Sequence, residues 1–233
     1  MVTRLFVIAI VPGIVLALSA YLTDRYDKEP LGLLLKVFIV GALSVIPTAI
    51  VEKLLISFNV FGGLLSAAFM AFIVAGFTEE FFKREVVLRT AFKHPAFDEK
   101  LDGIIYSAFA ALGFATVENV MYVVFRFAVN PYVGLYRGVF SVPAHLLFAV
   151  TMGYYLSLAK FAQNDESYRY YFRRSLTVPI ILHGIFDFIL MSKVPILLTF
   201  FIPFVLYLWV VNLRKLNRYY VESKNWHRIM NKK

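Results

Sequence analysis

The chain of 233 residues is 60% hydrophobic, 17% aromatic and only 17% charged. Because soluble domains carry about 25% charged residues, this composition excludes a water-soluble globule and indicates a membrane protein. The sequence contains no cysteine, which excludes disulfides, thiolate nucleophiles and thiolate metal ligands. Any chemistry must therefore use oxygen or imidazole groups.

Seven apolar stretches are long enough to cross the bilayer, since a helix needs about 20 residues to do so. They are predicted at residues 5–22, 37–58, 63–91, 104–129, 138–161, 175–191 and 194–212. The first stretch also fits a signal peptide, but no small-residue cleavage site follows it, so we predict an anchored span. The fold class is therefore an all-α polytopic transmembrane bundle, with one domain over 1–212 around a polar cavity and a basic cytoplasmic tail over 213–233.

Lysine and arginine are divided unequally between the two sides of this topology. Nineteen fall in one set of alternate connections, and the other set holds only Arg4, Arg126, Arg137 and Lys193. The positive-inside rule therefore predicts a multi-pass protein of the cell membrane with its N-terminus outside and its C-terminus in the cytoplasm. Seven of the basic residues belong to the tail beside a span, so the net charge of +9 predicts the lipid bilayer and no nucleic acid as a partner.

Two adjacent glutamates, Glu79 and Glu80, lie inside the third predicted span. Only about fourteen mostly apolar residues precede them, too few to cross a bilayer, so the helix must continue and carry them below the surface. Each has a cation four residues on, Lys83 and Arg84 respectively, and the two cations are expected to share the balancing of the acidic pair. The alternative interpretation is two structural ion pairs at a helix end near the membrane interface.

Further ionisable groups occur in the next three predicted spans, where each is a functional candidate because its burial in lipid is costly. Glu118 stands among small residues with no cation nearby in sequence. His145 follows a proline, and His183 precedes Asp187 by four residues, which places both on one helix face. Asp187 can therefore accept a hydrogen bond from one ring nitrogen of His183 and fix its tautomer.

Such a set of carboxylates and imidazoles supports hydrolysis of an amide by two routes. In one, a carboxylate takes a proton from the attacking water while the imidazoles stabilise the oxyanion, without a metal. In the other, Glu118, His145 and His183 bind a divalent ion, Zn²⁺ being suited to these ligands, and Glu79 or Glu80 is the base. No serine triad signature or H-E-x-x-H helix occurs in the sequence.

The ordered motifs resemble those of the PrsW-type membrane proteases, distant relatives of the type II CAAX prenyl endopeptidases. The resemblance covers about residues 10–212 and is carried by Tyr26-Asp27-Lys28-Glu29-Pro30, Gly76-Phe77-Thr78-Glu79-Glu80-Phe81-Phe82-Lys83, Phe97-Asp98-Glu99 through Asp102-Gly103, Gly113-Phe114-Ala115-Thr116-Val117-Glu118-Asn119, Pro143-Ala144-His145 and His183-Gly184-Ile185-Phe186-Asp187. The CAAX relatives usually have a histidine where this chain has Glu118, so their prenyl-substrate specificity does not carry over.

This resemblance implies a membrane-embedded endopeptidase that makes the site-1 cut in a single-pass anti-sigma factor during an envelope-stress response. It also implies that Glu79, Glu80, Glu118, His145, His183 and Asp187 form the catalytic site. Two other functions remain open from the residues themselves: a proton-coupled transporter that relays protons through the buried Glu and His groups, and a non-catalytic membrane scaffold.

Overall fold

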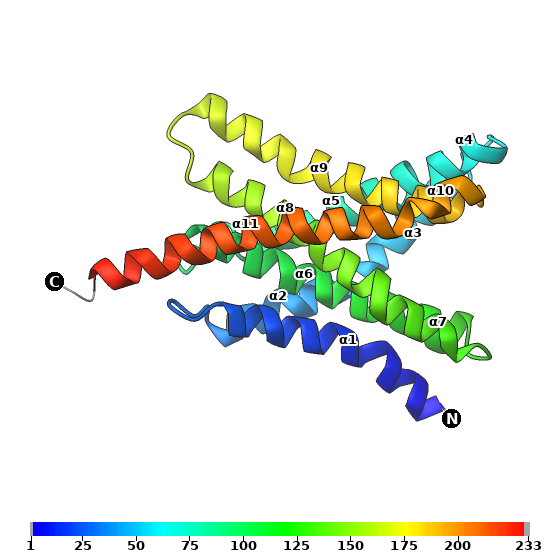
Figure 1. Ribbon diagram of the computed structural model, residues 1–233, viewed down its shortest axis with the longest axis horizontal. Helices are drawn as coiled ribbons and strands as arrows, with labels where there is room; N and C mark the ends of the chain where they lie inside the picture. Colours follow the sequence, from blue (N-terminus) through cyan, green and yellow to red (C-terminus); the bar gives the residue numbers. More distant parts are fainter. Residues whose placement is uncertain (1, 231–233) are drawn as a thin grey trace.

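The computed structural model describes residues 2–230, and these residues form helices and no strand (Figure 1). Among them, seven helical segments are long and apolar enough to cross a membrane, which confirms the predicted all-α fold with seven spans. The helices are α1 (Val2–Thr23), α2 (Leu31–Leu43), α3 (Val45–Ile56), α4 (Gly63–Ala68), η1 (Phe69–Phe77), α5 (Thr78–Thr90), α6 (Lys100–Val120), η2 (Met121–Arg126), α7 (Pro131–Tyr136), η3 (Arg137–Ser141), α8 (Val142–Lys160), α9 (Asp165–Met191), α10 (Pro195–Thr199) and α11 (Phe201–Met230). The three η segments are π-helical.

The helices extend beyond several of the predicted spans. The second span begins at Leu31, where a leucine-rich turn extends it, and the sixth begins at Asp165, where the polar residues 165–174 continue the helix. The side chain of Asn164 caps α9 by accepting a hydrogen bond from the Ser167 amide at 2.8 Å. Helix α11 continues unbroken from the seventh span to Met230. The predicted tail is thus helical as far as it is described, and residues 231–233 lie outside the described residues.

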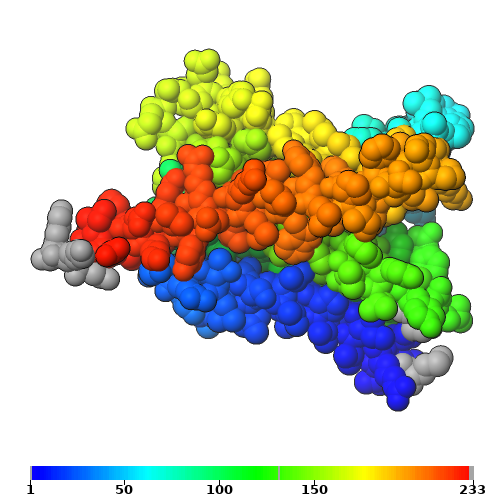
Figure 2. All heavy atoms as spheres, viewed as in Figure 1, coloured from blue at the N-terminus to red at the C-terminus, as the bar shows by residue number. Residues whose placement is uncertain are grey.

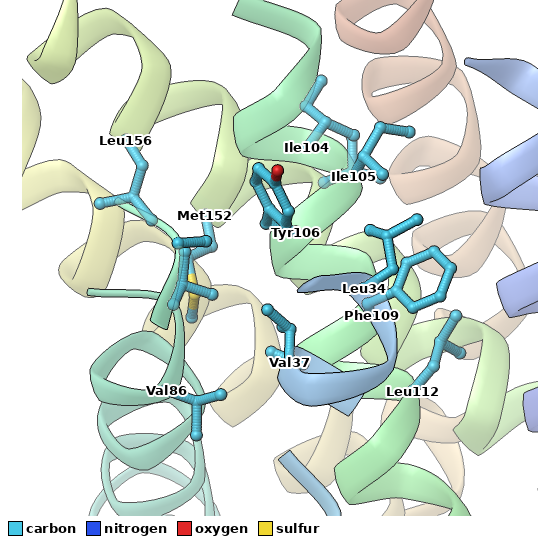
Figure 3. Close-up of a cluster of buried hydrophobic side chains, with 14 of the residues drawn as sticks. Leu34, Val37, Val86, Ile104, Ile105, Tyr106, Phe109, Leu112, Met152 and Leu156 are labelled. Carbon is cyan, nitrogen blue, oxygen red and sulfur yellow. The ribbon is translucent and has the colours of Figure 1, made fainter. Parts of the chain in front are cut away.

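Helix α6 is the centre of the bundle. Every residue from Leu101 to Thr116 is buried. Its side chains pack against α2, α5 and α8, and Figure 3 shows Tyr106 and Leu112 of α6 among Val37 of α2 and Met152 of α8. Since lipid tails are as apolar as these side chains, close van der Waals packing holds the helices together here.

Small residues let two other helices approach the backbone of α6. A Cβ atom built at Gly113 would collide with the carbonyl oxygen of Phe38 in α2, and one built at Gly153 in α8 would collide with the carbonyl oxygen of Gly103. These positions accept no larger side chain without separating the helices. The packing fixes α2 and α8 on α6, and with them the positions of Glu118 and His145.

The start of α1 and the end of α11 lie at opposite ends of the bundle (Figure 1), as an odd number of crossings requires. Helix α11 lies across the face shown in Figure 2, where its last turns project past the other helices at the C-terminal end. Lys100 and Glu222 form an ion pair at 2.8 Å that connects this projecting part of α11 to the start of α6.

Acidic side chains are buried at the C-terminal end of the bundle, where the α1–α2 connection contacts α6. Asp24 accepts a hydrogen bond from the Glu29 amide at 3.0 Å, and Glu29 accepts one from the Tyr106 hydroxyl. Asp102 caps α6 by accepting from the amides of Asp98 and Glu99 at 2.9 and 2.7 Å. Burial raises the pKa of Asp24 to about 6, and that of Glu29 and of Glu99 to about 7.

We predict that this acidic connection makes the protein less stable as the pH rises from about 4 to about 7. A carboxyl whose pKa is raised by folding holds its proton more tightly in the folded state, so it favours folding at low pH. That contribution is lost as the pH passes from the ordinary value near 4 through about 7. The Glu29→Gln variant, which cannot ionise, should lose stability less steeply over this range in thermal unfolding measured in detergent. The matched control is the exposed Glu166→Gln, and a Glu29→Gln profile parallel to that of the control would contradict the prediction.

Candidate active site

A cavity of about 510 Å³ lies inside the bundle between α3, η1, α5, α6, α8 and α9. Its walls are mostly apolar, as expected for a pocket inside a membrane protein. Its polar lining comes from residues far apart in the sequence: Glu52, Glu79, Glu118, Tyr122, Arg126, Arg137, His145, His183 and Asp187. The packing of α3, α8 and α9 on α5 and α6 therefore gathers the ionisable groups of five spans round one space.

The ammonium of Lys83 is the centre of the polar contacts. It donates to Glu79 Oε2, to Glu80 Oε1 and to His145 Nδ1, each at 2.9 Å. It also lies 4.4 Å from the centre of the Phe114 ring. The side chain of Lys83 is only 1% exposed, so this contact set replaces the hydration of the ammonium.

The tautomer of His145 follows from its neighbours. An ammonium can only donate a hydrogen bond, so His145 Nδ1, which faces Lys83 Nζ, accepts one and carries no proton. The proton is then on Nε2, which donates to Glu118 Oε2 at 3.0 Å. Glu118 is also paired with Arg137 at 2.8 Å. Glu118 and its partner Arg137 thus hold the imidazole of His145 in a defined orientation.

His183 lies between two carboxylates. Its Nδ1 faces Glu80 Oε1 at 3.0 Å, and its Nε2 faces Asp187 Oδ2 at 3.4 Å. The ring stacks on Phe148 with 4.9 Å between centres, which leaves it little rotational freedom. Asp187 is thus placed to accept a hydrogen bond from His183, as the four-residue spacing predicts. Glu80 is a second partner of the same ring.

Backbone features beside these residues allow the helices to approach so closely. Gly76 of η1 faces the backbone of α9, where a Cβ atom would lie 3.1 Å from Ile180 O and 3.3 Å from Gly184 N. The three π-helical segments all end or begin within four residues of Glu79, Glu118 or His145. Each extra residue in a π-turn rotates the following side chains, and such turns are frequent at functional sites.

Four of the predicted site residues converge closely. Glu79, Glu80, His145 and His183 are buried, and each offers a ligand atom within 4.8 Å of those of the other three. Glu118 and Asp187 contact the two imidazoles from outside this group. The converging set therefore differs from the predicted metal ligands, because Glu79 and Glu80 accompany the histidines in place of Glu118.

The predicted pairing of Glu80 with Arg84 does not occur. Arg84 Nη1 donates to the carbonyl of Phe172 at 3.2 Å, and its guanidinium lies 4.7 Å from the Phe172 ring. Lys83 lies about 60° from Glu80 round the helix and points into the same space, so it takes both carboxylates. Arg84 consequently cannot share the charge-balancing role that was expected of it.

Three charged groups of the cavity are absent from the predicted site. Glu52 lines the cavity from α3, Arg126 from η2 and Arg137 from η3. The rule that treats ionisable groups within spans as functional candidates would have found Glu52. In the sequence, Arg126 and Arg137 indicate only the topology, and nothing there predicts the contact of Arg137 with Glu118.

Comparison with known proteins places the chain in a class and then in a family. The model of the PrsW family of intramembrane metalloproteases matches residues 29–213. Protease PrsW of Clostridioides difficile (strain 630) is 44% identical over 222 residues, covering 94% of this chain and 93% of that protein. Protease PrsW of Bacillus subtilis (strain 168) is 37% identical over 88% of this chain and 91% of its own length, and that of Geobacillus kaustophilus (strain HTA426) is 39% identical over 79% and 78%. No solved structure matches the chain.

The chain is a membrane protease. It belongs to the PrsW family of intramembrane metalloproteases. This confirms the predicted resemblance and the predicted enzyme class, and it favours the protease over the transporter and the scaffold that the residues alone left open.

We predict that Lys83→Met strongly destabilises the folded protein. The change leaves Glu79 and Glu80 buried without their cation, and breaking a buried ion pair from one side costs about 3–5 kcal/mol. The control is Arg89→Met on the same helix, where the arginine side chain is 79% exposed and the expected change is within about 0.5 kcal/mol. The measurement is the midpoint of unfolding of both variants in the same detergent. Equal midpoints for the two variants would contradict a central role for Lys83.

Proposed function

We propose that this membrane protease is an endopeptidase that cuts a peptide bond of a single-pass membrane protein within or near the bilayer. The convergence of Glu79, Glu80, His145 and His183 in a cavity inside the bundle carries this proposal. The motif resemblance supports the more specific substrate, an anti-sigma factor cut at site 1 in an envelope-stress response.

We further propose that these four residues hold a divalent cation, with Zn²⁺ matching two imidazoles and two carboxylates. Glu80 Oε2 is buried and has no hydrogen-bond partner among residues 2–230, so an acceptor remains for a ligand. Four carboxylates against Lys83 and Arg137 also leave an excess of negative charge round the two histidines. When bound, such an ion polarises a water molecule and a carbonyl oxygen.

Lys83 supports the metal-free route as a second candidate mechanism. Its ammonium already contacts Glu79, Glu80 and His145, so the same atoms serve either this ammonium or a metal ion. With the ammonium in place, the acidic pair is balanced, and His183 Nε2, whose contact with Asp187 is 3.4 Å long, remains as a hydrogen-bond donor for a developing oxyanion.

In the metal-free route, the two glutamates are suited to different tasks. Glu79 lines the cavity, whereas Glu80 is 1% exposed and its Oε1 is held by Lys83 and His183. Glu79 can therefore reach a water molecule in the cavity and take its proton as the general base. Glu80 orients His183, whose Nε2 faces the cavity beside Asp187 and can deliver a proton to the departing amine.

We infer that the N-terminus lies outside the cell and the C-terminus in the cytoplasm. The strong Lys/Arg bias toward the connections on the side of the C-terminus supports this orientation. A reporter fused after Lys233 should be active only in the cytoplasm, and activity of that fusion outside the cell would contradict the orientation.

We predict that Glu79→Gln, Glu80→Gln and His183→Ala each lower the turnover number about 10²- to 10⁴-fold while the protein stays folded. Glutamine keeps the shape of glutamate but cannot take a proton. Turnover is measured in liposomes that contain the purified enzyme and a tagged single-pass substrate, and folding by thermal unfolding. The control Glu85→Gln lies on the same helix and pairs outward with Arg89, so it should cleave normally. A Glu79→Gln, Glu80→Gln double variant with near wild-type turnover would instead support two structural ion pairs.

For the metal, we predict about one equivalent of Zn²⁺ in the purified active enzyme by elemental analysis. The content should fall well below one in His183→Ala, because a ligand is lost, and remain in Glu85→Gln. Content far below one equivalent in active wild-type enzyme, together with cleavage that resists strong chelators, would contradict the metal and favour the route through Lys83.

A further inference from the structure

Arg126 is a cation of the active-site cavity without an acidic partner. Its guanidinium lies over the rings of Tyr122 and Phe127, at 5.3 and 5.4 Å from their centres. None of the carboxylates in the described part of the chain lies within 4.0 Å of it. Arg137, the other arginine of the cavity, is by contrast bound to Glu118 at 2.8 Å. Arg126 is therefore oriented by aromatic rings but not neutralised.

The position of Arg126 relates it to the catalytic residues. Glu118, Tyr122 and Arg126 follow each other at intervals of four, so they share one face of the α6–η2 helix, and all three line the cavity. The η2–α7 connection lies at the end of the bundle that holds the N-terminus (Figure 1). Arg126 is exposed there, so it stands at the mouth of the cavity and Glu118 stands deeper.

The charge of Arg126 is unexpected at this end of the protein. With Lys53 in the last turn of α3 included, this side carries five Lys/Arg residues against nineteen on the other side. Two of those five, Arg126 and Arg137, line the cavity. A guanidinium presents a planar pair of donors that matches a carboxylate in a bidentate manner. A cation at the mouth of a protease cavity, with no partner of its own, is suited to bind an anionic group of the substrate.

We propose that Arg126 binds an acidic side chain of the substrate and thereby selects where the substrate is cut. This inference rests on the proposed endopeptidase function and adds the substrate's chemistry. Arg126 lies eight positions along the helix from Glu118, or about 12 Å. An extended peptide covers this distance in about three to four residues. The acidic residue therefore stands three to four residues from the scissile bond, toward the membrane surface on the side of the N-terminus.

The test uses the full-length enzyme in phosphatidylcholine liposomes with a series of single-pass model substrates. Each substrate carries one Asp, Asn or Lys at a position two to six residues from the cut. At one position, three or four residues away, the Asp substrate should show a kcat/KM about tenfold above the Asn substrate, the gain expected from one charge-assisted hydrogen-bond pair. Arg126→Gln should abolish this preference, and Arg126→Glu should transfer it to the Lys substrate.

Two variants serve as controls for this charge exchange. Arg4→Gln removes an exposed arginine from the same side of the protein but outside the cavity, so the Asp preference should persist. Arg126→Lys keeps the charge and loses the planar fork, so the preference should shrink without reversing.

Equal cleavage of the Asp, Asn and Lys substrates by the wild type would overturn the inference and leave the proposed endopeptidase function intact. The same assay is repeated with phosphatidylglycerol added to the liposomes. The inference would also be overturned if Arg126→Gln left the Asp preference intact and changed only the response to this anionic lipid, because Arg126 would then bind a headgroup phosphate. If no substrate is cut at all, the endopeptidase proposal itself fails. Binding of the Asp and Asn substrates to the Glu79→Gln variant, with and without Arg126→Gln, then tests the charge selection without cleavage.

Discussion

The buried ammonium of Lys83 is the interaction on which the site depends. An unpaired carboxylate inside a membrane bundle costs several kcal/mol, and this chain places Glu79 and Glu80 side by side on one helix. Lys83 contacts both at 2.9 Å and reaches across to His145 of α8, so a single cation holds two acids and an imidazole together. The acidic pair is stable only while a cation stands among these atoms. The same requirement makes the group suited to a divalent metal ion, which would bring two charges to the same ligands.

The rest of the bundle positions this group. Glycine contacts set α2 and α8 against α6, and Gly76 sets η1 against α9, so the helices meet nearly backbone to backbone. In a bilayer the hydrophobic effect does not drive helices together, so they associate through such close contacts. Glu118, Arg137 and Asp187 then orient the two histidines from outside. The mouth of the cavity carries Arg126, which connects the geometry of the site to the choice of substrate.

Much of this was predictable from the sequence, and the remainder depends on distances between helices. Apolar runs of about 20 residues specify the spans, and the cost of buried charge marks Glu79, Glu80, Glu118, His145 and His183. The cation that pairs with Glu80 was not predictable, because the position of α9 decides between Lys83 and Arg84. Glu52 stands six residues from the end of its predicted span, where a charge usually reaches the headgroups, yet α3 turns it into the cavity. No residue pattern in the sequence predicts the π-turns beside the site residues.

The central claim is that groups on separate helices act as one catalytic unit, and a double-mutant cycle between Glu80 of α5 and His183 of α9 tests it most directly. The two groups face each other at 3.0 Å. The measurement is kcat/KM for wild type, Glu80→Gln, His183→Ala and the double variant in the same liposomes. Residues that act as a unit lose their effect together, so the double variant should be about as slow as the slower single variant. A double variant whose loss equals the product of the two single losses would show independent roles and contradict the account.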